Sequence, residues 1–247
     1  MDDVAREKIA LRVGDGSSMD AFVARPADGA QSPGMLVFQE AFGVNAHIRD
    51  VTERVARQGY VAIAPELFHR TARGFEGRYD GFSETRPHMQ AMTEAGAIDD
   101  IRAAFDWLCG NPHVQADRIG SIGFCMGGRM SFLACATVPL RAAISFYGGG
   151  IAATQLPKAK NLHGPMLLFW GGLDKHIGQD QIRAVGDELS RAGKPFINVE
   201  ISDADHGFFC DARGSYNAAA AREAWSLSVA FLETHVKGAG EKTRAAL

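Results

Sequence analysis

The sequence predicts an α/β protein whose sheet is mostly parallel and is covered by helices on both faces. Short apolar runs alternate along the chain with longer segments in which bulky apolar residues recur at helical spacing. Several of the short runs end directly in glycine or polar residues, as strands do where they enter loops. The chain has 247 residues and is 46% hydrophobic, so it can bury a core of its own. We expect a single domain over residues 1–247.

The expected strands start with an antiparallel hairpin, whose turn is the Gly-Asp-Gly-Ser segment at 14–17. Short apolar runs that read as buried strands follow it. The expected strands are residues 9–13, 19–24, 35–38, 60–64, 118–124, 141–146, 166–170 and 196–201. Right-handed crossovers bring the carboxyl ends of parallel strands to one edge of the sheet, where ligands bind in such folds.

The expected helices fill the gaps between these strands. They are residues 47–58, 94–109, 128–136, 179–192 and 218–236. The first of them buries Val51 and Val55 on one face and ends at Gly59, as helices often do. Residues 69–90 are the least regular internal stretch. We expect a surface loop there, with a lid over a binding pocket as the alternative. Residues 237–247 are polar and rich in small residues, which predicts a frayed tail.

Composition excludes several classes of function. A formal net charge of −3 and a pI near 6.2 lack the basic footprint of a nucleic-acid binder. No apolar run approaches the ~20 residues that span a membrane, and the first residues lack an apolar signal core. The four cysteines form no CxxC pairs, which favours a reduced setting. We expect a soluble, cytoplasmic protein that binds neither nucleic acid nor membrane. Its oligomeric state is left open.

The pentapeptide Gly-Phe-Cys-Met-Gly at 123–127 has the form of a nucleophile elbow, with Cys125 in the position of the usual serine. An apolar strand precedes it and a helical pattern follows it, so the strand–turn–helix context is present. The alternative is a chance match, because the chain contains 28 glycines. A thiolate at a helix N-terminus is stabilised by the helix dipole.

A thiol nucleophile needs a base, and the base needs a group that orients it. Asp174 and His206 each follow an expected strand, and they come after Cys125 in the order nucleophile, acid, histidine. The alternatives are a turn-forming aspartate and a solvated loop histidine. Asp203 and Asp205 are rival acids close to the histidine in sequence. The agreement of three residues in order and context favours Cys125, Asp174 and His206 as the catalytic group.

Three motifs make the chain resemble the dienelactone hydrolases (carboxymethylenebutenolidases), a family of α/β-hydrolases. They are Gly-Phe-Cys-Met-Gly-Gly at 123–128, Phe-Gln-Glu-Ala-Phe-Gly-Val-Asn at 38–45, and Ala-Ile-Ala-Pro-Glu-Leu-Phe at 62–68. The resemblance extends from about residue 9 to about residue 235. It implies the α/β-hydrolase fold and a hydrolase that cleaves a small lactone or carboxylic ester through a Cys-His-Asp triad and an acyl-enzyme.

Further roles follow for residues around the elbow. The backbone N–H groups of Met126 and Ala41 are the expected oxyanion-hole donors. The resemblance implies that Glu40 contacts the resting thiol and helps to ionise it. The alternative is that Glu40 forms a structural ion pair with an arginine of a loop.

The chain departs from the family where substrate is bound. The family grips a substrate carboxylate with two arginines, one of them four residues after the catalytic histidine, where this chain has Cys210. A neutral thiol cannot replace the bidentate guanidinium. We therefore expect one cationic contact at most, from Arg78 or Arg86, in a pocket made more apolar by Phe208. Arg213 is the reserve candidate.

The remaining cysteines and histidines suggest no cofactor. The spare histidines show no metal-ligand spacing with cysteines or carboxylates, so we expect no metal and no other cofactor. Cys109 and Cys135 fall in expected helices and are expected to be small core residues. Two alternatives to a lactone or ester hydrolase remain. One is a broader carboxylesterase or thioesterase on the same scaffold. The other is a non-catalytic relative that binds a ligand or senses redox state.

Overall fold

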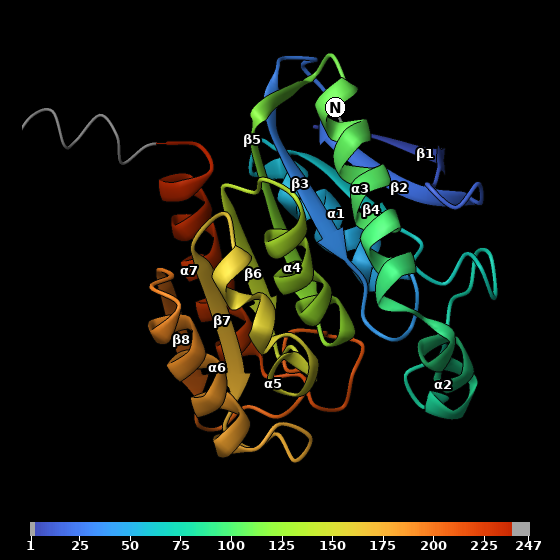
Figure 1. Cartoon of the computed structure of the whole chain (residues 1–247). Helices are drawn as coiled ribbons and strands as arrows, with labels where there is room; N and C mark the ends of the chain where they lie inside the picture. The colour runs from blue at the N-terminus through green and yellow to red at the C-terminus, as the bar shows by residue number, and fades with distance from the viewer. Residues whose placement is uncertain (1–2, 239–247) are drawn as a thin grey trace, which may run out of the picture.

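A single eight-stranded sheet organises the computed structural model, which describes residues 3–238 (Figure 1). The strands lie in the order β1-β2-β4-β3-β5-β6-β7-β8, with β1 antiparallel to β2, β2 antiparallel to β4, and the other pairs parallel. Their bounds are β1 Val4–Arg12, β2 Ser18–Pro26, β3 Ser32–Phe38, β4 Val61–Pro65, β5 Val114–Phe124, β6 Ala142–Phe146, β7 Met166–Gly171 and β8 Phe196–Ile201. The predicted hairpin and mostly parallel sheet are confirmed.

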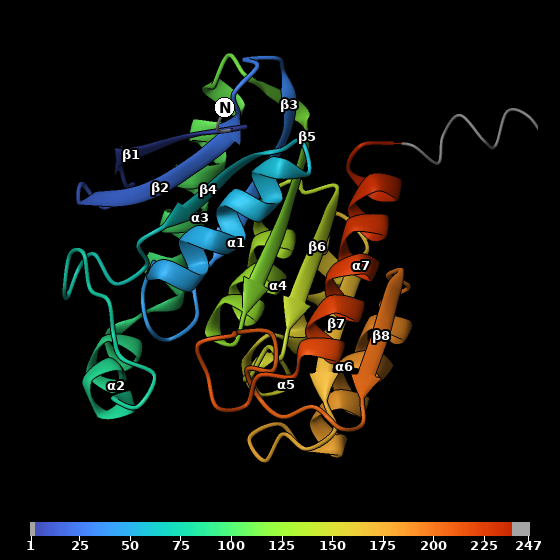
Figure 2. The same ribbon diagram turned by 180° about the vertical axis from the view of Figure 1, so that it is seen from behind.

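Helices cover both faces of this sheet. In Figure 1 the helices α3, α4 and α6 lie in front of the strands, and Figure 2 shows α1 and α7 on the opposite face. The helix bounds are α1 Ala46–Arg57, α2 Phe82–Ala91, α3 Glu94–Gly110, α4 Met126–Thr137, α5 Ile151–Thr154, the 3-10 helix η1 Leu156–Asn161, α6 Gln179–Arg191 and α7 Ala218–His235. Among the described residues, no helix has the length and apolar character needed to cross a membrane.

The sandwich of layers explains why the strands are apolar throughout. Every residue of β3, β4, β6 and β7 is buried, because helices pack on both sides of these strands. The edge strand β8 instead alternates between half-buried and exposed residues. The core is thus centred on the middle strands, and their carboxyl ends all point toward one edge of the sheet, the lower edge in Figure 1.

The expectation of a loop over residues 69–90 is wrong for its second half, which forms α2. The sequence does not predict this helix because it has no apolar stripe. Thr85 is its only buried residue, and Pro87 lies inside it. The expectation that Cys109 is a core residue is also wrong, since its side chain is exposed near the end of α3, whereas Cys135 is buried.

The beginning of the expected frayed tail contacts the body of the protein. The Nζ atom of Lys237 donates a hydrogen bond to the carbonyl oxygen of Gln58 (2.6 Å), and the same ammonium lies 4.9 Å from the centre of the Tyr60 ring. Residues 239–247, the larger part of that segment, lie outside the described residues.

Candidate active site

Cys125 occupies the sharp turn between β5 and α4. Its φ is +55° and its ψ is −117°, a conformation that side chains rarely adopt, and α4 begins at the next residue, Met126. The flanking glycines are required by contact distances. A Cβ on Gly123 would lie 1.9 Å from the carbonyl oxygen of Gly127, and a Cβ on Gly127 would lie 2.3 Å from that of Phe38. The pattern found in the sequence is therefore a steric necessity of this turn.

His206 and Asp174 meet at the same edge of the sheet. The Nδ1 atom of His206 lies 2.7 Å from Oδ2 of Asp174, and both side chains are largely buried. The other carboxylate oxygen, Oδ1, accepts hydrogen bonds from the backbone N–H groups of His176 (2.7 Å) and Ile177 (3.3 Å). Asp174 is thus both a turn-forming aspartate and the partner of the histidine, so the two interpretations of its sequence position are compatible.

The protonation of His206 is set by these neighbours. Burial lowers its pKa, but hydrogen bonds with Asp174 and with Cys125 outweigh burial and raise the pKa to about 10. Burial likewise opposes ionisation of Asp174, whose pKa is nevertheless lowered by its bond to His206. A charged imidazolium between a carboxylate and a thiol is the arrangement that favours a thiolate.

The rival acids have other partners. Asp205 Oδ1 accepts a hydrogen bond from the backbone N–H of His206 (2.6 Å), as a turn residue does. Asp203 is exposed, and its carbonyl oxygen accepts a bond from the Asn217 amide (3.3 Å). Their placement leaves Asp174 as the carboxylate at the histidine ring.

Glu40 lies beneath this group and is completely buried. Its Oε1 atom accepts a hydrogen bond from Nη1 of Arg213 (3.1 Å), while its Oε2 atom has no hydrogen-bond partner. Burial raises the pKa of Glu40 against the opposing charge of Arg213. Room for the guanidinium comes from Gly207, whose φ is +80° and on which a Cβ would lie 2.4 Å from Arg213 Cζ. The ion-pair alternative for Glu40 is the contact present in this structure.

Tyr147 adds a second strained position next to His206. Among the described residues, Cys125 and Tyr147 are the only non-glycine residues with positive φ, at +55° and +37°. The Tyr147 ring is fully buried and lies 5.0 Å from the His206 ring, between centroids, and its hydroxyl has no hydrogen-bond partner. Strain of this kind is retained where the surrounding structure fixes it, and it often marks functional sites.

A cavity of about 420 Å³ opens over Cys125 and His206. Ala41 and Met126, the expected oxyanion residues, both line it. Its far wall is apolar and aromatic, and the residues of that wall are Phe42, Tyr79, Phe82 and Met89. Two of these side chains come from α2, so the segment expected to be a loop or a lid does border the cavity, as a helix.

Comparisons with known proteins agree with this geometry. The family model described as "Dienelactone hydrolase family" matches residues 19–236. The chain belongs to the dienelactone hydrolase family. It is 29% identical to the carboxymethylenebutenolidase of Pseudomonas putida, over 92% of this chain and 95% of that protein. A Synechocystis sp. protein provisionally named for the same activity is 36% identical, over 87% of this chain and 92% of that protein.

A solved structure supports the same family. A crystal structure of a Klebsiella pneumoniae protein, provisionally named a dienelactone hydrolase, is similar with a TM-score of 0.84 and 29% identity, covering 94% of this chain and 99% of that one. The chain is accordingly a dienelactone hydrolase-like enzyme of the ester and lactone hydrolases. The resemblance carried by its three sequence motifs is confirmed.

The residues expected to bind substrate in this dienelactone hydrolase-like protein do not line the cavity. Arg78 is 77% exposed in its side chain and pairs with Asp80 (2.9 Å), and Arg86 is exposed; neither lines the cavity. Phe208 is fully buried against Tyr147 and does not line the cavity either. The structure therefore does not bring these three residues to the cavity over Cys125.

The cavity contains charged residues that sequence reasoning missed or ranked low. Arg129 and Arg213 line it, and His176 stands edge-on to His206 with 5.5 Å between ring centres. Arg129 was detectable in principle, because it follows Cys125 by four residues, about one turn along the same helix. Arg213 could be reached only through the tertiary fold, since 173 residues separate it from Glu40.

Three buried side chains near the cavity carry the donor atoms of a possible metal site. Glu40, His47 and Cys210 place an oxygen, a nitrogen and a sulfur within 4.8 Å of one another, and both ring nitrogens of His47 lack hydrogen-bond partners. The donor types suit Zn²⁺. Burial, and then the charge of Arg54, lower the pKa of His47 to about 4. The positive charges of Arg54 and of Arg213, which already pairs with Glu40, both repel a metal cation at this position.

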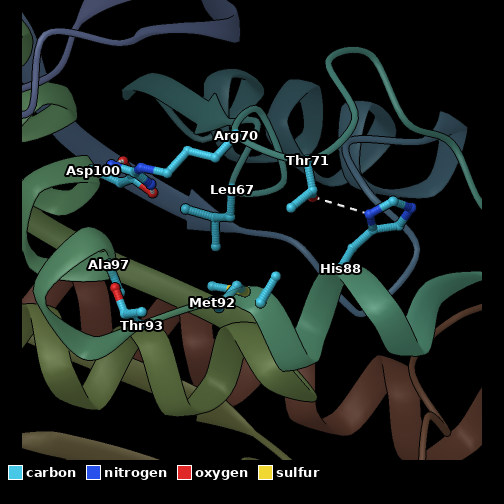
Figure 3. A pocket seen from close by; sticks show the side chains of 9 residues that line it. Leu67, Arg70, Thr71, His88, Met92, Thr93, Ala97 and Asp100 are labelled. Carbon is cyan, nitrogen blue, oxygen red and sulfur yellow. Dashed lines mark hydrogen bonds and ion pairs between the residues drawn. The ribbon is translucent and has the colours of Figure 1, made fainter.

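A smaller cavity of about 100 Å³ lies away from Cys125, between the loop after β4 and the helices α2 and α3 (Figure 3). Its polar side chains bond to one another: Arg70 donates to both carboxylate oxygens of Asp100 (2.9 Å each), and His88 Nδ1 lies 3.0 Å from Thr71 Oγ1. These contacts fix the loop to α3 and give this cavity a structural explanation.

Proposed function

We propose that this enzyme hydrolyses a small lactone or carboxylic ester, with Cys125 as nucleophile, His206 as acid and base, and Asp174 as the residue that orients His206. The observation that carries the proposal is the position of His206. One ring nitrogen bonds Asp174 at 2.7 Å, the interaction of the ring with Cys125 contributes to its raised pKa, and the cavity is lined by both Cys125 and His206. That is the geometry required of a base between a nucleophile and an orienting acid.

The proposed reaction has two halves. In the first, the Cys125 sulfur attacks the carbonyl carbon, and the oxyanion that forms lies at the N-terminus of α4, near the backbone N–H groups of Met126 and Ala41. The C–O bond then breaks, and His206 gives its proton to the leaving oxygen. A lactone substrate stays attached as a hydroxyacyl thioester of Cys125.

In the second half, water completes the hydrolysis. His206, now neutral, takes a proton from a water molecule, and the water oxygen attacks the thioester carbonyl. The C–S bond breaks, the acid product leaves, and the thiolate–imidazolium pair is restored. The role of Asp174 is to hold the ring in one orientation and to stabilise its charge. A thiol nucleophile must stay reduced, so a cytoplasmic location is part of the same proposal.

Glu40 has a supporting role in this proposal. Burial raises the pKa of its carboxyl, and the nearby charges of Arg213 and His206 oppose this shift. We propose that it promotes ionisation of the Cys125 thiol when Arg213 shifts its hydrogen bonds toward a bound substrate. The broader carboxylesterase alternative is supported by the apolar wall of Phe42, Phe82 and Met89, which would accept acyl or alcohol groups larger than those of dienelactone.

The test is a panel of small lactones and aryl esters assayed with the wild type and with Cys125→Ala. We expect turnover in the wild type and a loss of at least about a thousandfold in kcat/KM in the variant. Cys109→Ala is the matched control, because Cys109 is exposed on α3, away from the cavity. Equal turnover by Cys125→Ala and Cys109→Ala would refute the proposed nucleophile.

A further inference from the structure

Arg129 is the charged residue of the cavity whose contacts the proposed reaction does not explain. It lies in α4 four residues after Cys125, about 6 Å along the helix axis, and lines the cavity over the thiol. Within residues 3–238, no side chain pairs with its guanidinium through a hydrogen bond or an ion pair. Arg129 is half-buried, and this burial lowers its pKa, although the nearby Cys125 opposes that shift.

An unpaired guanidinium that is half-buried has lost part of its hydration. The other arginine of the cavity has a carboxylate partner, since Arg213 bonds Glu40. A charge that is partly removed from water favours a partner that replaces the lost hydration. Because Glu40 already offsets the charge of Arg213, Arg129 is the cation through which the cavity attracts an anion.

The local backbone is shaped to hold Arg129 there. Its Nη1 atom lies 2.7 Å from the place that a Cβ on Gly150 would occupy, so a side chain at Gly150 would displace the guanidinium. Gly149, the preceding residue, lines the same cavity. The glycines that follow β6 therefore leave a recess for a planar cation beside the thiol.

Arg129 also borders a second cavity of about 190 Å³ on the far side of its side chain. Gln155 lines this second cavity, and its Oε1 atom is buried without a hydrogen-bond partner. Gln155 therefore carries a free acceptor in the lining of a cavity that Arg129 also borders. A guanidinium has five N–H donors in a rigid fork, which suits such divided bonding.

We propose that Arg129 is the specificity-determining residue of this enzyme and binds a carboxylate carried by the acyl part of the substrate. The proposal rests on the proposed function, because it places the carboxylate relative to the carbonyl that Cys125 attacks. Arg129 lies one helical turn from Cys125, so we place the carboxylate within the acyl chain whose carbonyl Cys125 attacks. Arg213, whose charge Glu40 offsets, is then a secondary contact of the substrate.

The kinetic test compares two esters that differ only in a charge: the 4-nitrophenyl monoester of adipic acid and its methyl-capped neutral form. We expect Arg129→Gln to lower kcat/KM for the charged ester by about 10- to 100-fold, the loss of one charge-assisted contact, and to change the neutral ester little. Arg129→Lys should keep part of the preference, since it retains charge without the fork. Arg78→Gln, outside the cavity, should leave both esters unchanged.

Binding without turnover separates this proposal from the proposed function. Calorimetry on Cys125→Ala should show adipate binding more tightly than neutral adipamide, and Cys125→Ala/Arg129→Gln should lose that difference while keeping the unfolding midpoint of its parent. If the difference survives in the double variant, or disappears with Arg213→Gln instead, the assignment to Arg129 is overturned. The calorimetric comparison tests the role of Arg129 in binding even if neither ester is hydrolysed. An absence of hydrolysis would contradict only the proposed reaction.

Discussion

The interactions of His206 with Asp174 and Cys125 give this residue a predictable dependence on pH. Its pKa is raised to about 10, against an ordinary value of 6.5. A histidine whose pKa is raised by folding stabilises the fold fully below the unfolded pKa, and this stabilisation is lost as pH rises through the folded pKa. The contribution of the Asp174–His206 pair is therefore full below about pH 6.5 while Asp174 stays ionised, and it fades as pH rises toward 10. In acid it is lost as well, because Asp174 takes up a proton.

Asp174→Asn tests this coupling. We expect kcat to fall on the order of 10³- to 10⁴-fold, because the ring loses the carboxylate that stabilises its charge. Denaturant titrations should show that the substitution costs more stability at pH 6 than at pH 10. Asp203→Asn is the control, since Asp203 is exposed and its bond with Asn217 uses the backbone carbonyl rather than the carboxylate. A stability cost that is the same at both pH values would show that the carboxylate does not hold the imidazolium.

The four free cysteines should differ sharply in reactivity. Partial desolvation and the charge of Asp106 raise the pKa of Cys109, and burial raises the pKa of Cys135 and, to about 11, that of Cys210. Cys125 alone has a hydrogen-bonded imidazole beside it and a helix N-terminus behind it. We expect iodoacetamide to modify Cys125 first at neutral pH, although Cys109 is the more exposed thiol, as mass spectrometry of time points would show.

His206→Asn provides the matching variant for that labelling. It should slow modification of Cys125 on the order of tenfold and leave the rate at Cys109 unchanged. Modification of all cysteines in order of exposure, with Cys109 first, would mean that the thiol is not activated.

At the scale of elements, the turn from β5 into α4 depends on backbone atoms that almost touch. A Cβ on Gly123 would meet the Gly127 carbonyl oxygen at 1.9 Å, and backbone cannot move aside as a flexible side chain can. We expect Gly123→Ala to cost at least about 3 kcal/mol in urea unfolding. Gly110→Ala is the matched control, because open space surrounds that position in α3 and the change should be neutral or slightly stabilising. Equal effects would contradict the steric argument.

The elements differ in how well the sequence predicts them, for physical reasons. Helices α1, α3, α6 and α7 were predicted to within two residues at each end, because each buries an apolar face that repeats with the helical period. Helix α2 has no such face, because Thr85 is its only buried residue, so the helical period of apolar residues is missing from its sequence. The strand β5 begins four residues before the apolar run, where pairing with Ser32 and Pro33 extends it through polar residues.

The same reasoning explains the predictability of the site. Cys125, Asp174 and His206 each follow a strand, so local patterns reveal them. Arg129 could be found from its spacing of one helical turn after Cys125, whereas Arg213 reaches the cavity only through the tertiary fold and leaves no local signature. Arg78 and Arg86 are candidates for binding substrate when residues 69–90 are taken as a loop. In the structure Arg78 bonds Asp80, and Arg86 lies on the surface over the Phe82 ring.

At the scale of the whole molecule, the site is assembled from parts of the chain that are remote in sequence. The carboxylate of Glu40 follows β3, and its partner Arg213 follows β8, the last strand of the sheet. Between them lie β5, which presents Cys125, and β7, which precedes Asp174. The site therefore belongs to the carboxyl edge of the sheet as a whole rather than to any one segment.

That arrangement has a consequence for how the protein acquires its activity. Helices form from neighbouring residues within microseconds, whereas contacts between segments far apart in the chain must first close a long loop. The bond between Arg213 and Glu40 closes a loop of 173 residues, so it belongs among the late events of folding. A refolding chain should regain its helical circular dichroism before its hydrolytic activity, and on the ribosome the enzyme stays inactive until its last strand has emerged.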